Sequence, residues 1–223
     1  MLRAMRTALA RETVILLADR SAPLQYGLFG LSAMLVAAAS LDQRGMPGAT
    51  ALIGANTLVL FFTQTLMVEA VHRSDFASGL WQRIRLHQAV VPWYFGKIIS
   101  LSLLVGLLAV PLLWLGGQFL RVALPGDVYW QLPLCSGVGA VGFFALALVL
   151  LPVAAATGRR ALFLPLLLFP LGFPLLLGLV QVGLALTGAP GIDAGFWLRL
   201  IVALDALYAA LGLMLIEVVF IGE

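Results

Sequence analysis

Six long apolar segments, separated by short polar stretches, decide what this chain can fold into. They cover about residues 23–41, 49–68, 92–120, 132–156, 161–186 and 196–220. Each is close to the roughly 20 residues that a helix needs to cross a hydrocarbon core about 30 Å thick. Because backbone groups in a bilayer must be hydrogen-bonded within the protein, each segment is expected to be an α-helix. The sequence therefore predicts an all-α integral membrane protein with six transmembrane helices.

The overall composition agrees with this fold class. Of the 223 residues, 62% are hydrophobic and 10% are charged, whereas soluble domains carry about 25% charged residues. A soluble protein of this size could not hide so much apolar surface from water, so the bilayer must act as the solvent. We find no linker and no low-complexity segment, and we expect residues 1–223 to form a single transmembrane domain.

Basic residues are divided unequally between the polar stretches. Ten lie before the first apolar segment, within 69–97 or within 157–160: Arg3, Arg6, Arg11, Arg20, Arg73, Arg83, Arg85, Lys97, Arg159 and Arg160. The alternate stretches hold three: Arg44, Arg121 and Arg199. Because Lys and Arg accumulate in cytoplasmic loops, this division predicts that both termini are cytoplasmic.

The first 20 residues are too polar to form a further span. Leu2, Met5, Leu9 and Leu16 recur at helical spacing, with arginines between them. A helix with one apolar face and a basic opposite face lies in the plane of the membrane surface. We therefore expect an N-terminal interfacial helix over 1–20, and no cleavable signal peptide.

The polar stretch 69–97 separates the second and third apolar segments and holds both histidines of the chain. Within it, Phe76, Leu80, Ile84 and His87 recur at spacings of four, four and three, so they share one side of a helix. This stretch is too hydrophilic to cross a membrane and too amphipathic to be a simple linker. It predicts a cytoplasmic amphipathic helix that docks a partner.

Local signals put the bounds of this helix at 72–90. Ser74 is a candidate N-cap, and Pro92 suits the first position of the next helix. Glu69 lies at the expected membrane edge, four residues before Arg73. Because residues four apart face each other on a helix, we interpret Glu69 as a structural or coupling charge.

Prolines and glycines interrupt two of the apolar segments. Pro170 and Pro174 lie four residues apart in the fifth segment, and each removes a helix hydrogen bond. We expect a bent or broken helix there, which shapes an inner cavity or a dimer-facing surface. In the third segment, Pro111 and the pair Gly116 and Gly117 are expected to kink the helix or to end it early.

Polar and small residues inside the apolar segments are further candidates. Asp205 lies in the first half of the sixth segment, where a charge costs at least about 2.5 kcal/mol, so either a function or a partner is expected. The second segment carries a polar set that is expected to form hydrogen bonds between helices: Asn56, Thr57, Thr63, Gln64 and Thr65. The fourth contains three glycines that suit close helix packing: Gly137, Gly139 and Gly142.

No motif for catalysis or for cofactor binding occurs in the sequence. There is no G-x-x-x-x-G-K-[ST] loop for ATP, no H-E-x-x-H and no G-x-S-x-G. The single cysteine, Cys135, excludes an internal disulfide, and His72 and His87 are interpreted as solvated loop residues. We therefore expect no enzymatic activity, no bound cofactor or metal ion and, because no dense Lys/Arg run exists, no nucleic-acid partner.

The order of these elements resembles a known class of transporter subunit. A basic surface helix, six spans and an amphipathic cytoplasmic helix after the second span are similar to the permeases of ABC-2 type exporters. More narrowly, the chain resembles the haem exporter B subunit (CcmB) family of the cytochrome c maturation system. The matching residues are Glu69, Arg73, Ser74, Asp75, Gly79, Pro92, Gly96 and Lys97, together with the double-proline segment 169–177.

This resemblance implies a multi-pass ABC transporter permease of the bacterial inner membrane, which is surrounded by lipid. Two copies would form a homodimer and bind two copies of the ATP-binding subunit CcmA, with CcmC, CcmD and the haem chaperone CcmE as further partners. ATP hydrolysis on CcmA would drive the release of haem-loaded CcmE, so haem would be handled by the complex. The implied docking residues are Phe76, Gly79, Leu80 and Ile84, with Glu69, Arg73, Asp75 and Lys97 as coupling or structural charges.

Three other hypotheses remain open at this point. The first is a divergent ABC-2 permease that exports another substrate. An intramembrane enzyme would need polar residues that converge at one depth, whereas Asn56, Gln64, Gln181 and Asp205 are scattered through the spans. A passive assembly scaffold would not need so developed a docking helix.

Overall fold

Long α-helices account for nearly all of the residues that the structure, a computed structural model, describes, which are 21–42, 48–77, 90–156 and 160–221. The helices are α2 (Ser21–Asp42), α3 (Gly48–Ala77), α5 (Val90–Phe119), α6 (Val128–Ala156), α7 (Arg160–Leu186) and α8 (Ala194–Ile221). No strand occurs in these ranges. The predicted all-α class is therefore confirmed. The predicted interfacial helix over 1–20 lies outside the described residues.

Five of these helices, α3, α5, α6, α7 and α8, are long and apolar enough to cross a membrane. The apolar part of α2 with described side chains, Pro23–Ala37, is shorter. Long apolar helices of this kind are typical of a multi-pass membrane protein. Their exposed surfaces are correspondingly rich in large apolar side chains, among them Leu107, Leu134 and Met214.

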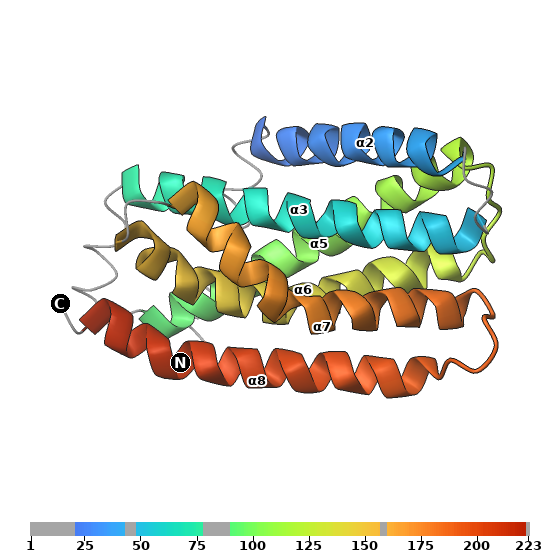
Figure 1. The fold of residues 1–223 in the computed structure, drawn as a ribbon. Helices are drawn as coiled ribbons and strands as arrows, with labels where there is room; N and C mark the ends of the chain where they lie inside the picture. Colours follow the sequence, from blue (N-terminus) through green and yellow to red (C-terminus); the bar gives the residue numbers. More distant parts are fainter. Residues whose placement is uncertain (1–20, 43–47, 78–89, 157–159, 222–223) are drawn as a thin grey trace.

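Successive helices run in opposite directions, so their ends gather at the two ends of the bundle (Figure 1). One end holds the start of α2, the end of α3, the start of α5, the end of α6, the start of α7 and the end of α8. The opposite end holds the turns that join α5 to α6 and α7 to α8. Arg121 and Arg199 lie at this second end.

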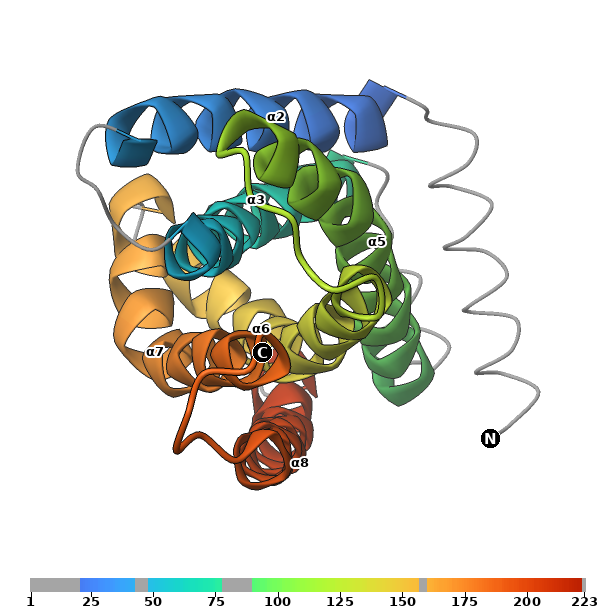
Figure 2. The same cartoon turned by 90° about the vertical axis from the view of Figure 1, so that its right-hand side faces the viewer.

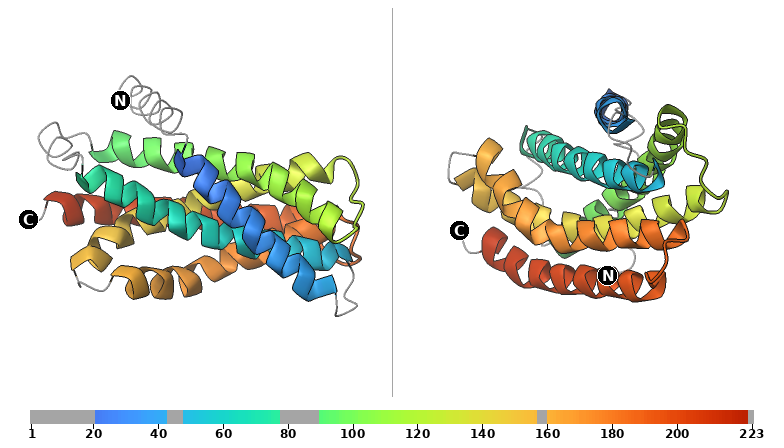
Figure 3. Two further views of the ribbon diagram at one scale, coloured as in Figure 1. Left: turned by 90° about the horizontal axis from the view of Figure 1, so that it is seen from above. Right: turned by 45° about the vertical axis from the view of Figure 1, so that its right-hand side comes forward.

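Helix α6 is the centre of the bundle. It packs against α3, α5, α7 and α8, and its Phe144 and Leu148 are completely buried. An end-on view shows α2 and α8 on opposite sides of the bundle (Figure 2), and α2 lies across α3 and α5 (Figure 3). Different faces of α6 therefore contact four of the other described helices.

The structure corrects the expected start of the amphipathic helix at residue 72. Helix α3 continues to Ala77, so Ser74 lies inside its last turns and does not cap a new helix. A short polar sequence at the end of a long apolar helix can extend that helix, because each added residue needs no new nucleation. Val90 already belongs to α5, so Pro92 lies in the first turn of α5 and is not its first residue. The part from 78 to 89 lies outside the described residues.

The third apolar segment does not end early. Helix α5 continues through Pro111 and past Gly116 and Gly117 to Phe119. The two glycines instead serve packing: a Cβ on Gly116 would collide with Met34 of α2 and lie 2.7 Å from Leu52 Cδ1 of α3. A sequence reading cannot distinguish a glycine that ends a helix from one that admits a neighbouring helix.

Helix α7 is continuous but bent. The helix extends over all of Arg160–Leu186, so Pro170 and Pro174 do not end it. The half that begins at Arg160 runs at an angle to the half that ends at Leu186 (Figures 1 and 3). Pro170 is exposed on the outer surface of the bundle, and Pro174 is half-buried. Whether the prolines shape an inner cavity or a dimer surface stays a prediction.

The turn between α7 and α8 is closed by standard capping interactions. Gly188 has a φ of 82°, and the Ala189 N–H donates to the Leu184 carbonyl at 3.0 Å, as in a helix end with a left-handed residue. Helix α8 starts where the Asp193 carboxylate accepts the Gly195 N–H at 2.8 Å. These capping interactions explain why α7 ends and α8 begins within this short turn.

Candidate functional site

The candidate site is built on the one buried face of α8. This helix is exposed over most of its surface, but a stripe at helical spacing of four, three, four and four is buried: Ile201, Asp205, Tyr208, Gly212 and Ile216. Two of these five residues carry polar side chains and both face α6 or α7. The polar pair therefore lies where α8 meets the rest of the bundle.

Asp205 binds the backbone of α6. Its side chain is 6% exposed, and its Oδ1 accepts the Gly142 N–H at 2.9 Å. A Cβ on Gly142 would collide with this oxygen and would lie 3.1 Å from Asp205 Cα and 3.2 Å from the Tyr208 ring. A glycine is therefore needed at this position for the two helices to approach so closely.

Tyr208 binds the backbone of α7, one turn further along α8. Its hydroxyl donates to the Leu171 carbonyl oxygen at 2.7 Å. Leu171 lies between Pro170 and Pro174, in the part of the chain where proline removes helix hydrogen bonds. We call Gly142, Leu171, Asp205 and Tyr208 the α8 polar junction. It brings together Asp205 and the proline segment, which the sequence analysis treated as unrelated.

A second polar contact joins α5 to α6 close to α8. The Tyr94 hydroxyl is buried and donates to the Ala145 carbonyl oxygen at 3.0 Å. A Cβ on Gly212 of α8 would collide with this same hydroxyl. Gly212 thus leaves room for the Tyr94 hydroxyl between α6 and α8. Together with the two hydrogen bonds of the α8 polar junction, the Tyr94 hydrogen bond joins four helices, α5 to α8, through side chains that bind backbone groups.

The α8 polar junction fixes the position of α8 in the bundle. Both of its polar side chains are bound to main-chain groups, and this orients α8 about its own axis relative to α6 and α7. Hydrogen bonds between transmembrane helices contribute about 0.6 kcal/mol on average. Within the described residues, no group of three or more His, Cys, Asp or Glu side chains is placed to hold a metal ion.

The predicted coupling charges occupy different environments. Glu69 is half-buried in α3, and Arg73 and Asp75 lie in the last turns of that helix. Lys97 is only 3% exposed and lies inside α5, so its side chain belongs to the bundle and not to a solvated loop. Long basic side chains can be buried along their aliphatic part, which the charge count along the sequence does not register.

The predicted docking residues are only partly visible. Phe76 lies in the last turn of α3, whereas Gly79, Leu80 and Ile84 lie outside the described residues. The end of α3 and the start of α5, which flank that segment, lie at the same end of the bundle (Figure 1). Both borders of the predicted docking stretch therefore lie at one end of the bundle.

Sequence reasoning missed Tyr94, Tyr208 and Gly212 as parts of the polar contacts. One signal was present for Tyr208, which lies three residues after Asp205 and so on the same helix face. No comparable signal existed for Tyr94 or Gly212, because their partners lie on other helices. The prediction that Gly142 suits close helix packing is consistent with its contact with α8.

Comparisons with known proteins do not assign a family. No protein-family model matches this chain, and neither a curated protein nor a solved structure matches it. A functional proposal must therefore rest on the sequence and on the geometry described above.

Proposed function

We propose that this chain is the membrane-spanning permease subunit of an ABC transporter complex of the ABC-2 type, similar to the haem exporter B subunits of cytochrome c maturation. Two copies form a homodimer in the bacterial inner membrane. ATP is hydrolysed on a separate subunit of the CcmA type. The energy released serves cytochrome c maturation through CcmC, CcmD and the haem chaperone CcmE.

The observation that carries the proposal is the common location of the helix ends that flank the polar stretches. The ends next to 1–20, 78–89 and 157–159 lie at one end of the bundle (Figure 1). Nine of the thirteen basic residues of the chain fall within 1–20, 69–90 and 157–160. An ATP-binding subunit that docks on a membrane protein needs such a single polar end on the cytoplasmic side.

A six-span arrangement agrees with the dimensions of α2. This helix has 22 residues and is therefore about 33 Å long, enough for a hydrocarbon core about 30 Å thick. Six spans of alternating direction leave both termini on one side of the membrane. With α2 as the first span, this side is the cytoplasm, as the distribution of basic residues predicts.

Docking of the ATPase is assigned to apolar residues at the end of α3 and in the stretch that follows it. Phe76 lies in the last turn of α3. Leu80 and Ile84 follow it in the sequence by four and eight residues, which is the spacing of one and two helical turns. Burying each of these side chains is worth roughly 1.5–3 kcal/mol. A short helix is marginal alone, so another surface must cover this face, and a groove on the ATPase is the partner that the transporter proposal requires.

The contacts of α8 suggest how a movement at the docking end reaches the membrane. Side-chain to backbone hydrogen bonds join α5 to α6, α6 to α8 and α7 to α8. Since these bonds leave little freedom for rotation between the four helices, we expect α5 to α8 to move as one body.

The proposal is tested by a Leu80→Asp, Ile84→Asp double variant. We expect this variant to insert into the membrane but to lose the ATP-binding subunit on purification and to fail in cytochrome c maturation. A matched control is Ser78→Asp, Gln82→Asp, which adds the same charge to the opposite helix face and should retain the subunit.

Two outcomes would contradict the proposal in different ways. If the Leu80→Asp, Ile84→Asp variant retains the ATPase at wild-type stoichiometry, these residues do not dock it, and the bilayer surface is the better partner for the apolar face. If an ATPase copurifies but cells without the chain mature cytochromes c normally, the chain is an ABC-2 permease for another substrate.

A further inference from the structure

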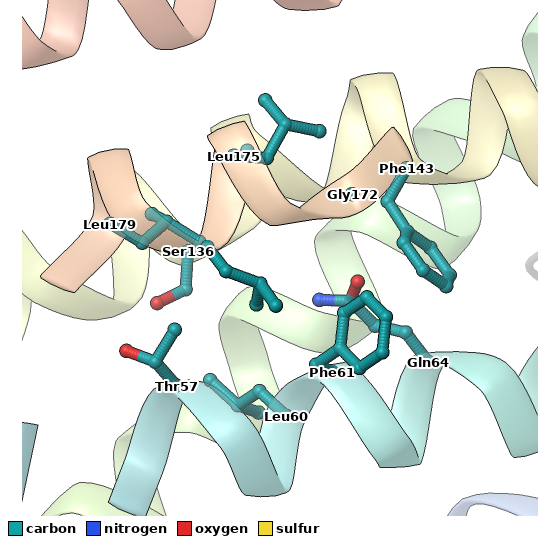
Figure 4. A pocket seen from close by; sticks show the side chains of 11 residues that line it. Thr57, Leu60, Phe61, Gln64, Ser136, Phe143, Gly172, Leu175 and Leu179 are labelled. Atoms are coloured by element: carbon teal, nitrogen blue, oxygen red, sulfur yellow. The ribbon is translucent and has the colours of Figure 1, made fainter. Parts of the chain in front are cut away.

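A groove on the outer surface of the bundle lies between α2 and α3. Helix α2 is on the side of the bundle opposite α8 (Figure 2), so the groove is separate from the α8 polar junction. Its volume is about 730 Å³, within the roughly 300–1,000 Å³ of ligand pockets. The interior cavity between α3, α6 and α7, which Gln64 lines (Figure 4), has a volume of only about 10 Å³ and is too small for an organic ligand.

Small side chains recess the surface along this groove. Of its lining residues, Val36 and Leu58 are exposed at the rim, and a Cβ on Gly54 would meet no atom within 4 Å. Five of the lining residues are no larger than alanine: Ala33 and Ala37 of α2, and Ala51, Gly54 and Ala55 of α3. The groove is therefore open to the surroundings of the bundle, which for helices of this apolar length are lipid.

The groove has the length of one leaflet of a membrane. Along α2 it extends from Phe29 to Ser40, and along α3 it extends from Thr50 to Phe62. At a rise of 1.5 Å per residue, these stretches are about 16–18 Å long. Half of a hydrocarbon core measures about 15 Å, whereas a transmembrane helix of a second copy would need the full thickness of about 30 Å.

Helices α2 and α3 meet at the inner end of the groove. A Cβ on Gly30, next to Phe29, would lie 3.6 Å from Thr63 Oγ1, next to Phe62, and 3.0 Å from Leu112 Cδ1 of α5. Phe62 lies half-way along α3, which extends over Gly48–Ala77. The groove thus belongs to one half of the bundle and ends near its middle.

Tryptophan side chains mark the membrane boundary at the outer end of the groove. Trp114 and Trp130 are 54% and 66% exposed, and both lie at the end of the bundle that holds the turn between α5 and α6 (Figure 1). Trp is enriched where the hydrocarbon core meets the headgroups. Gly116, two residues after Trp114, packs against Leu52, two residues after Thr50. The outer end of the groove is therefore level with this boundary.

We propose that this groove binds one phospholipid of the leaflet at that end, with an acyl chain lying between α2 and α3. An acyl chain is apolar and has the length of a leaflet, as the groove requires. A chain in the groove contacts two helices at once, whereas a lipid beside Leu207, on the exposed face of α8, contacts one. This inference does not depend on the proposed transporter function.

The mouth of the groove suits a headgroup that carries both charges. Helix α2 ends there at Asp42, and α3 begins there at Gly48. The C-terminal end of a helix is negative and the N-terminal end is positive. Arg121 adds positive charge close to the start of α3, because the adjacent Val122 packs against Gly48. Phosphatidylethanolamine, with its ammonium and phosphate groups, therefore matches the mouth better than the anionic phosphatidylglycerol.

Photo-crosslinking of the full chain in lipid vesicles tests the proposal. The vesicles contain a trace of phosphatidylethanolamine with a diazirine at the end of one acyl chain, and mass spectrometry locates the labels. Phe62 in the groove and Leu207 on α8 are each 51% exposed and lie at similar distances from the starts of their helices, so they are a matched pair. We expect stronger labelling of Phe62. Replacing phosphatidylglycerol by unlabelled phosphatidylethanolamine as the bulk lipid should reduce the Phe62 label about two- to five-fold by competition and leave the Leu207 label unchanged.

A Gly54→Leu variant fills the groove. We expect its Phe62 label to fall to the level of Leu207, whereas Ala203→Leu, which adds bulk to the exposed face of α8, should leave the Phe62 label unchanged.

Three outcomes would overturn the proposal. Equal labelling of Phe62 and Leu207 in the wild type would show ordinary bilayer lipid only. An unlabelled groove beside a labelled Leu207 would show that a protein surface, such as a second copy, covers it. A strong Phe62 label that does not respond to the bulk lipid would contradict the headgroup match. If Gly54→Leu fails to fold, the wild-type comparison decides alone.

Discussion

The close approach of α6 and α8 can be tested by adding one methyl group at Gly142. In Gly142→Ala the new Cβ collides with Asp205 Oδ1 and lies 3.1 Å from Asp205 Cα and 3.2 Å from Tyr208 Cδ2. A backbone atom cannot rotate away, so α8 must shift from α6. Overpacking of this kind costs about 1–3 kcal/mol, and loss of the Asp205 hydrogen bond adds about 0.6 and at most about 1.7 kcal/mol. Because replacing a helical glycine by alanine itself returns up to about 1 kcal/mol, we expect a net loss of about 1–4 kcal/mol in the free energy of unfolding.

Reversible unfolding in mixed micelles, followed by far-ultraviolet circular dichroism, measures this change. The matched control is Gly54→Ala on α3, where a Cβ meets nothing within 4 Å. Removing a helical glycine there should raise stability by up to about 1 kcal/mol. The reasoning is refuted if Gly142→Ala and Gly54→Ala unfold with equal free energies. As a further check, the cost of Gly142→Ala should decrease when Asp205 is alanine, because the colliding carboxylate is then absent.

Two further predictions concern the contacts of α8 and the orientation of the chain. Tyr208→Phe removes the hydroxyl that binds the Leu171 carbonyl. It should lower the free energy of unfolding by about 0.6 kcal/mol, and by at most about 1.7 kcal/mol. An unchanged free energy of unfolding would mean that this hydrogen bond does not form. With Cys135 replaced by serine, a cysteine at Gly126 should react with an impermeant thiol reagent in intact cells, and one at Gly158 only after permeabilisation. Labelling of Gly158 from outside would reverse the proposed orientation.

The helices themselves could be predicted well from the sequence. The fifth apolar segment, 161–186, corresponds to α7 at Arg160–Leu186, and the sixth, 196–220, corresponds to α8 at Ala194–Ile221. Apolar length is a property of the local sequence, so it defines helices without knowledge of their neighbours. One exception was the end of α3, where the polar residues up to Ala77 continue a helix that local capping signals would have ended at Ser74. Another was α5, which does not end early at Gly116 and Gly117.

The candidate site was predictable only in part. Asp205 was singled out because a carboxyl in an apolar segment needs a partner, but the partner is the Gly142 N–H, 63 residues earlier in the chain. A main-chain N–H inside a helix carries no sequence signal as a hydrogen-bond donor. Likewise, the polar character of Gln64 was evident from the sequence. The small cavity that Gln64 lines exists only where α3, α6 and α7 meet, and no local sequence pattern predicts it.

Hydropathy and charge along the chain, by themselves, determined that this protein is helical, apolar enough for a membrane and polar in the stretch between its second and third apolar segments. These properties depend on the transfer of each segment between water and lipid, and that transfer is nearly independent of tertiary contacts. Only the tertiary structure decided which glycines admit a neighbouring helix, where Lys97 is buried and what Asp205 and Tyr208 bind. Inside a bilayer the lipid tails are as apolar as a leucine side chain, so hydrophobicity does not determine which helices pack together. Close packing and a few hydrogen bonds determine it.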